Sequence, residues 1–587
     1  LSLTSEDVHA APRPAARLRT TPAANRLWAA GIVVLLIAGG VVLAFQTRAT
    51  TFWADEWTWI LTRRQGGLGT LLDAHNSHFS LVPVLIYKAL FATAGLRHYW
   101  PYRGVLIALQ LLVVLLVFIY ARGRVGGYVA LLAAALILFF GPGWQDILWP
   151  FQMAWLITAA TGVGALLALD RRDRAGDLTA CVLLVISVAS AGPGLAMLAG
   201  GLVEVLLRRR RRDLWIPGVP IVIYAIWSLG YQSTAIDAHS ITRLPQFVFH
   251  AAAGVMSSLV GLAGVNVYSD SGTYTNWGAP LLILGLLAAA LGLMRLGRIP
   301  HRVVSLAAIV LGFWVLTGIG RAYAQLGSIV VTSTGDESRY LYVGAVFVVL
   351  LAVELMRGHT PGLWTGLVLG VLAVAAIISN LGTMRDGSAF LRSTAQLTEG
   401  ELATLNLDRH LVRPDFVSGG FLFGILSAGP WFSAEHDLGY QAAVPGPISA
   451  LGPTARQAAD QQLMKIQGLA LTPTASGAPP ATAAPVVVSM SSGTRTATGA
   501  CVRFRPSAFT PSGTTPSLAV TVPPSGLAFS NGDAAATVAV RRFGTGFNTL
   551  GTLAPGARAR LTPRRDGSTT PWQAVLTATE PVSVCAA

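Results

Sequence analysis

Charged side chains are scarce in this sequence of 587 residues. They make up 12% of it, whereas a soluble domain carries about 25%. Hydrophobic residues make up 53%, and the mean hydropathy is +0.57. This balance excludes an ordinary water-soluble enzyme and indicates that most of the chain lies in lipid.

Lysine is almost missing: Lys88 and Lys465 are the only two among 42 basic residues. The net charge of +15 is therefore carried by arginine, and it would suit a nucleic acid if it formed one basic surface. Instead, the arginines lie in short segments between apolar runs. The charge therefore indicates membrane topology, and we expect no nucleic-acid partner.

Long apolar runs fill the first two-thirds of the chain. Because about 19 residues of helix cross a hydrocarbon layer of about 30 Å, we expect about eleven spans. The first run is interpreted as a retained span, with a cleaved signal peptide as the alternative. The fifth and sixth runs are short and could form a re-entrant pair. The expected spans are 27–45, 104–120, 126–140, 151–169, 178–191, 195–207, 215–230, 279–294, 303–319, 340–356 and 361–379.

Arginine-bearing loops follow every second span. Because cationic loops stay in the cytoplasm, this alternation places the tail 1–26 inside and the C-terminal region outside. The apolar segment 247–265 is interpreted as an interfacial or re-entrant helix, because a further span there would place the cationic loop 295–302 outside. Within a membrane domain over 27–380, the expected outer loops are 46–103, 141–150, 231–278 and 320–339.

The last third of the chain has the composition of water-exposed domains. We expect a mostly helical segment over 381–471, a linker over 472–485 and a small β-sandwich over 486–587. Cys501 and Cys585 bracket the sandwich, whereas the third cysteine falls in a span. An outside location permits a disulfide between Cys501 and Cys585, with two free thiols as the alternative.

The first outer loop carries two candidate clusters for chemistry, since ionisable groups near hydrocarbon are costly. Asp55 and Glu56 stand among four aromatic side chains, and adjacent carboxylates suit proton transfer or cation binding. A solvated acidic pair is the alternative. His75 and His78 are three residues apart and would share a helical face, where they could bind a phosphate or a metal. No third metal ligand is identifiable, so the metal is unknown.

The second outer loop carries another acid at an aromatic boundary. Asp146 stands in the segment Trp-Gln-Asp-Ile-Leu-Trp over 144–149, and Gln152 lies about one turn into the next span. Interface anchoring explains the tryptophans but not the acid. We therefore expect Asp146 to share a site with the acids of the first loop.

A late outer loop is flanked by Arg321 and Arg339, and Tyr340 follows the second arginine. Arginine on the outer side runs against the charge bias, so it needs a reason. A guanidinium is shaped for bidentate binding of phosphate. For Arg339, a local pair with Asp336 or Glu337 is the alternative.

These motifs, in this order and on this side, resemble the GT-C superfamily of polyprenyl-phosphate-sugar-dependent glycosyltransferases, in particular its bacterial and actinobacterial members. The resemblance covers about residues 28–380. It implies a polytopic α-helical membrane protein with about eleven spans, followed here by an extracytoplasmic helical segment and β-sandwich. The motifs that carry it are the acid pair, the His-Asn-Ser-His motif, the 144–149 segment with Gln152, and Ser338-Arg339-Tyr340.

The resemblance implies inverting transfer of a sugar from a polyprenyl-phosphate donor to an envelope glycan or lipid acceptor, on the outer face of the plasma membrane. Asp55 would be the general base on the acceptor hydroxyl. Glu56 and Asp146 would position the acceptor or a divalent cation, although the acid motif lacks a third acid. Arg339 and His78 would bind the leaving phosphate. The other expected substrate-binding residues are His75, Gln152, Arg321 and Tyr340.

Two other classes of function stay open. A transporter, flippase or polymer ligase of lipid-linked saccharides would place ionisable residues near the middle of the spans and often contain repeats, and few such charges are found. A non-catalytic envelope scaffold would make Asp55 replaceable.

Overall fold

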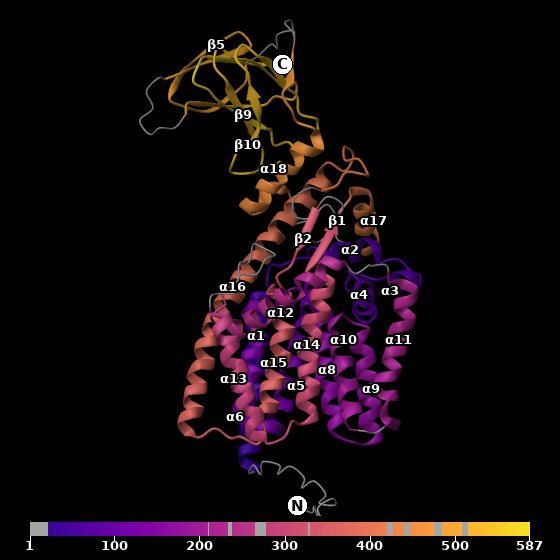
Figure 1. Cartoon of the computed structure of the whole chain (residues 1–587). Coiled ribbons are helices and arrows are strands. Elements are labelled where there is room, and N and C mark those ends of the chain that lie inside the picture. The colour runs from indigo at the N-terminus through magenta and orange to yellow at the C-terminus, as the bar shows by residue number, and fades with distance from the viewer. Residues whose placement is uncertain are drawn as a thin grey trace, which may run out of the picture. The chain divides into compact units, whose positions relative to one another are not determined.

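A computed structural model gives the structure of the chain, which divides into two compact units (Figure 1). Unit 1 comprises Leu1–Ala49, Arg63–Thr93 and Tyr99–Leu391. Unit 2 comprises Thr50–Thr62, Ala94–His98 and Arg392–Ala587. The structure describes residues 22–208, 211–232, 237–263, 277–326, 329–418, 426–439, 447–474, 484–507 and 515–587.

Each of the eleven expected apolar runs forms a helix. Among the described residues, seven helices are long and apolar enough to cross a membrane, or eight with the bent pair Gly127–Leu138 and Gly141–Leu148. The protein is therefore a multi-pass membrane protein. The helices are α1 (Pro22–Gln46), α5 (Trp100–Val125), α6 (Gly127–Leu138), α8 (Met153–Asp170), α9 (Arg174–Val188), α10 (Pro193–Leu207), α11 (Trp215–Tyr231), α13 (Gly278–Leu296), α14 (His301–Arg321), α15 (Ser338–Leu355) and α16 (Leu363–Leu407).

Glycine and proline set the ends of several helices. Gly126 has a φ of 83° and separates α5 from α6, a backbone conformation that glycine adopts without strain. Pro193 is the first residue of α10, where its missing N–H has no helical partner to lose. The two short runs of the sequence thus become α9 and α10, helices of 15 residues each.

The segment expected to be interfacial or re-entrant lies in α12 (Ala238–Leu259). This helix packs against α13, α14 and α15 within unit 1. It is absent from the helices of the described chain that are apolar enough to cross a membrane. Residues 264 and 265 of the expected segment lie outside the described residues.

Ion pairs of two buried arginines join the helix ends at one end of unit 1. Arg124 of α5 donates to Asp170 at 2.8 Å and also to Glu354. Arg302 of α14 donates to Asp170 at 2.7 Å and lies 3.6 Å from Glu204. We call these five residues the distal charge network. The two arginines belong to the cationic loops of the topology argument, yet they are buried and paired rather than free in solvent.

Unit 2 contains two antiparallel sheets, as expected for its last hundred residues. The strand orders are β10-β9-β12-β7-β4 and β3-β11-β8-β13-β6-β5. Alternate residues such as Phe504, Val520 and Leu576 are completely buried and form the core between the sheets. The strands are β3 (Thr472–Pro473), β4 (Val487–Ser491), β5 (Gly493–Thr498), β6 (Cys501–Pro506), β7 (Ser517–Thr521), β8 (Leu527–Ser530), β9 (Ala536–Arg541), β10 (Asn548–Leu553), β11 (Arg558–Leu561), β12 (Gln573–Thr577) and β13 (Val582–Ala586).

Helix α18 (Pro453–Gln467) shares the core of the sandwich. The carboxylate of Asp460 accepts hydrogen bonds from the backbone N–H groups of Arg542, Phe543 and Gly544, at 2.7 to 2.9 Å. The expected linker 472–485 begins with strand β3, which pairs with β11, and its residues 475–483 lie outside the described residues. The sandwich therefore includes residues before the boundary expected at 486.

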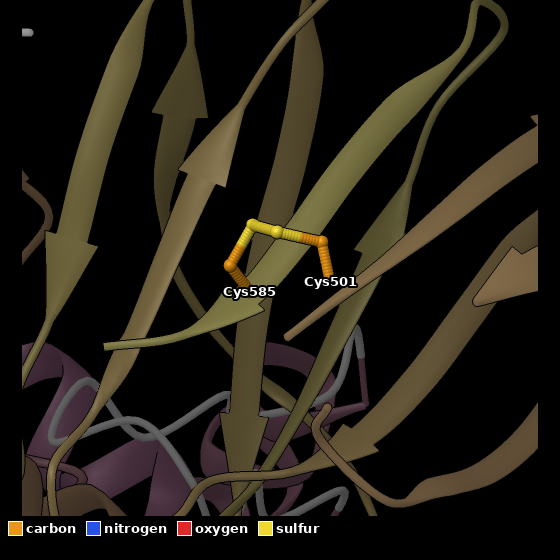
Figure 2. The surroundings of a disulfide bond; sticks show 2 residues. All are labelled: Cys501 and Cys585. Atoms are coloured by element: carbon orange, nitrogen blue, oxygen red, sulfur yellow. A yellow bond between two sulfur atoms is a disulfide. The ribbon is translucent and has the colours of Figure 1, made fainter. Parts of the chain in front are cut away.

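Cys501 and Cys585 form a disulfide between the paired strands β6 and β13 (Figure 2). Disulfides persist in oxidising compartments and are rare in the cytosol. The bond is consistent with an extracytoplasmic location of this part of the chain.

Candidate active site

Asp146 lies in α7 (Trp144–Leu148), a short helix between the 3-10 turns η1 (Gly141–Gly143) and η2 (Pro150–Gln152). A Cβ atom on Gly141 would stand 1.7 Å from the carbonyl oxygen of Asn380. A Cβ atom on Gly143 would stand 2.6 Å from the Cβ atom of Tyr342. The two glycines thus allow a backbone approach that no other residue permits.

A hydrogen bond ties this loop to the start of α15. The backbone N–H of Gln145 donates to Oγ of Ser338 at 3.1 Å. The neighbours of these two residues, Asp146 and Arg339, therefore belong to the same region. Arg339 acts electrostatically on the Asp146 carboxylate. The strands β1 (Tyr323–Leu326) and β2 (Ile329–Thr332) mark this end of the bundle, where α14 ends and α15 begins (Figure 1).

Asp146 is completely buried. Neither of its carboxylate oxygens has a hydrogen-bond partner among the described residues. An ionised carboxylate away from water is costly unless it is paired and hydrogen-bonded. The approach of Arg339 offsets part of this cost by its charge.

His75 and His78 are joined by a tight two-residue turn rather than a helix. Their backbones exchange hydrogen bonds of 2.8 and 3.2 Å, and Asn76 and Ser77 have φ values of 49° and 68°. Positive φ at both central residues defines a type I′ turn. The prediction that the two histidines share a helical face is therefore wrong. The guanidinium of Arg321 donates to the carbonyl of Asn76 at 2.7 Å and holds the turn.

The ring of His78 is half-buried beside positive charge. Its Nε2 lies 3.5 Å from the Arg321 guanidinium, and a Cβ on Gly192 would stand 2.8 Å from its Cε1. Burial first, and then the charges of Arg321, His75 and Arg339, lower the pKa of His78 to about 3. The imidazole is therefore neutral at physiological pH. It can donate one hydrogen bond and accept another.

The loop before α15 buries two carboxylates next to Arg339. Glu337 accepts a hydrogen bond from the backbone N–H of Gly335 at 3.1 Å. Burial raises the pKa of Glu337, and the charge of Arg339 opposes this shift. The charge of Arg339 thus acts on Glu337, in agreement with the alternative of a local pair. It also acts on Asp146 and His78.

Aromatic rings join the arginine loop to the second outer loop. The ring of Trp155 lies 5.8 Å from that of Tyr340 and 6.5 Å from that of His78, measured between centroids. Gln152, just before α8, is 4% exposed, and its Oε1 has no partner among the described residues. We call Asp146, His78, Arg321 and Arg339 the Asp146 site. Gln152, Tyr340 and His75 belong to the same end of unit 1.

The acid pair belongs to unit 2 and is described there by itself. Asp55 begins α2 (Asp55–Thr62) and is half-buried. Glu56 is completely buried, and its Oε2 accepts a hydrogen bond from the backbone N–H of Trp53 at 3.0 Å. Glu56 therefore fixes the turn at the start of α2, a structural task that its sequence position did not reveal. Asp55 is the more accessible carboxylate of the pair.

Sequence reasoning missed Arg63, which organises the first outer loop of unit 1. Its guanidinium donates to the carbonyls of Gly69 and Thr70 at 3.1 Å and of Asp73 at 2.9 Å. These carbonyls lie in or directly after α3 (Gly69–Leu72). Arg63 thus fixes the segment that leads into the histidine turn. An arginine in an outer loop was the available signal, as it was for Arg321 and Arg339.

Within the described chain, no group of three or more His, Cys, Asp and Glu side chains could hold a metal ion. His75 and His78 lie at the two ends of a tight turn rather than on one helical face. The charge of Arg339 acts on Asp146 and would oppose a cation there. The described residues therefore do not form a protein cage for a divalent cation.

No protein-family model matches this sequence, and no curated protein matches it. Among solved structures, the chain is similar to the crystal structure of ArnT from Cupriavidus metallidurans bound to undecaprenyl phosphate. The identity is 14% over 67% of this chain and 84% of that one, with a TM-score of 0.41.

Proposed function

We propose that this protein transfers a sugar, with inversion, from a polyprenyl-phosphate donor to an envelope glycan or lipid acceptor on the outer face of the membrane. The Asp146 site carries this proposal. Two arginines and a neutral, half-buried histidine lie there at the end of a membrane bundle. Fixed cations out of bulk water stabilise the charge of a departing phosphate.

The donor class follows from the location. An enzyme with its site on the outer side has no access to cytoplasmic nucleotide sugars, so the activated sugar must come on a lipid. The disulfide of unit 2 supports the outside location of the C-terminal region. The arginine alternation of the sequence supports the same orientation.

Asp55 is the residue we assign as general base. Its carboxylate takes the proton of the acceptor hydroxyl while the hydroxyl oxygen bonds to the anomeric carbon. The bond from that carbon to the phosphate oxygen breaks, and polyprenyl phosphate leaves. Arg339 and Arg321 hold the phosphate, and His78 supplies a hydrogen bond. Glu56 positions the turn that carries Asp55.

The test is sugar transfer in proteoliposomes from a radiolabelled polyprenyl-phosphate sugar to an envelope fraction. We expect Asp55→Asn to lower the rate by about 10²- to 10⁴-fold, because a general base contributes about that factor. Asp73→Asn is the matched control, since Asp73 is an exposed acid at the edge of the same loop. A chelator arm reports whether a divalent cation takes part.

An Asp55→Asn variant that transfers as fast as the parent would remove Asp55 from the reaction. A parent protein that transfers no sugar but moves the labelled lipid across the bilayer would favour the transporter class instead.

A further inference from the structure

Asp146 is a buried charge whose oxygens have no hydrogen-bond donor among the described residues. Protonation does not remove the cost, because a buried O–H group and its carbonyl oxygen would also lack partners. Buried polar groups in native proteins are nearly always satisfied. The exception at Asp146 therefore asks for a group that the protein itself does not supply.

The backbone that leads into Asp146 is closely packed. Gly141 and Gly143 lie against neighbouring atoms with no room for a Cβ, and the Gln145 N–H is bonded to Ser338. These contacts hold the backbone on the N-terminal side of the acid. The carboxylate can therefore reach a ligand only by rotation of the Asp146 side chain about its own bonds.

A second acceptor without a donor lies six residues away. Oε1 of Gln152 is buried and has no partner in the described part of the chain, and η2 contacts α7. Both side chains therefore lack hydrogen-bond donors rather than acceptors. A ligand that satisfies them must present several N–H or O–H groups.

A sugar fits this requirement better than a cation does. The positive charge of Arg339 acts on Asp146 and would repel a divalent ion, and the described residues offer no set of three ligands. Adjacent hydroxyl groups of a sugar can donate to both oxygens of a carboxylate and to an amide oxygen. Arg339 would at the same time meet the phosphate to which that sugar is attached.

We infer that Asp146 and Gln152 bind hydroxyl groups of the sugar on the lipid donor, and that they set which sugar is accepted. This inference rests on the proposed function, because the glycosylated lipid is the donor of the proposed reaction. It assigns Asp146 to recognition of the sugar rather than to a divalent cation or to the acceptor.

The test is binding to the full-length protein in nanodiscs, measured by native mass spectrometry. The probes are undecaprenyl phosphate alone and the same lipid carrying a hexose or a pentose. We expect the parent to bind at least one glycosylated lipid more tightly than the bare lipid. Asp146→Ala and Gln152→Ala should each lower this preference about tenfold or more. Binding of the bare lipid should not weaken in either variant, because Arg339 loses a neighbouring negative charge in Asp146→Ala.

Folding is checked with Asp146→Asn, which keeps the size of the side chain and removes the charge. Its melting temperature without ligand should stay close to that of the parent, because the lower cost of burying a neutral amide is opposed by the loss of the interaction with Arg339. Asp533→Asn, on the exposed surface of unit 2, is the control that should change neither property.

Three results would overturn the inference: equal weakening of bare and glycosylated lipids by Asp146→Ala, a preference that disappears with a chelator and returns with Mn²⁺, or no preference in the parent. If the parent transfers no sugar but binds the glycosylated lipid preferentially, and Asp146→Ala abolishes that preference, the proposed reaction is refuted and the inference is supported. Loss of transfer in Asp146→Ala with an unchanged preference would overturn the inference and leave the proposed reaction standing.

Discussion

His78 shows how burial sets the charge of a single residue at the Asp146 site. Its pKa is lowered to about 3 by burial and by neighbouring positive charge, whereas the unfolded chain has a histidine pKa of about 6.5. Between these values the unfolded state binds the additional proton. The free energy of unfolding therefore falls as the pH falls below about 6.5.

We expect His78→Gln to lessen this acid sensitivity. Each pH unit in that window is worth about 1.4 kcal/mol for a fully shifted group. Thermal unfolding of parent and variant in detergent, at about pH 7 and about pH 5, measures the difference. His239→Gln is the control, because His239 is largely exposed. Equal acid sensitivity in parent and His78→Gln would contradict the assignment.

At the residue scale, the sequence predicted which types of side chain stand at the outer end but not their local geometry. Asp146 and Arg339 were identified because a charge at a membrane boundary needs a reason. The helical spacing of His75 and His78 was misleading, because Asn76 and Ser77 adopt positive φ. Asparagine favours that conformation, so Asn76 was a signal for a turn.

At the scale of elements, hydropathy located the helices well because lipid demands long apolar segments with satisfied backbones. It separated a span at 361–379 from an outer helical stretch, whereas the structure joins both in the 45-residue α16. The residues between them include Gly382 and Gly387 but no proline, and a helix tolerates glycine at a cost of about 1 kcal/mol each. The distal charge network could not be predicted, since pairing across 132 or 230 residues leaves no local pattern.

The disulfide links two neighbouring strands of one sheet in the sandwich. We expect Cys501→Ala combined with Cys585→Ala to lower the free energy of unfolding of unit 2 by about 2–4 kcal/mol, mainly because the unfolded chain regains freedom. Denaturant unfolding followed by tryptophan fluorescence measures the change. Cys181→Ala, at a buried free thiol in α9, is the control and should leave the unfolding of unit 2 unchanged. Unchanged unfolding of the double variant would show that the bond adds no stability.

At the scale of the whole molecule, the membrane bundle has two different ends. Helix α14 runs from Arg302 to Arg321 over about 30 Å, so it joins the distal charge network to the Asp146 site. One end is rich in paired charges, and the other holds acceptors without donors. We interpret the first as the structural end and the second as the functional end.

Arg302→Gln tests the structural end. The variant leaves the buried Glu204 with Arg208 alone and the partly exposed Asp170 with Arg124 alone. We therefore expect a loss of about 1–3 kcal/mol in the free energy of unfolding, discounted for these partners and for solvent. Unfolding in mixed detergent measures it. Arg298→Gln, an exposed arginine four residues earlier, should cost little. Equal stability of the two variants would show that the network does not hold the bundle together.

The distal charge network also constrains the order in which the bundle is made. Arg124 and Asp170 emerge from the ribosome well before Arg302 and Glu354, which lie 132 and 230 residues from their partners. A chain that ends before α14 can pair Arg124 with Asp170 and Arg208 with Glu204, but it lacks the links that Arg302 and Glu354 make to these groups. Synthesis of α14 and α15 completes the set. Closure of the network is thus a late step in the formation of the bundle.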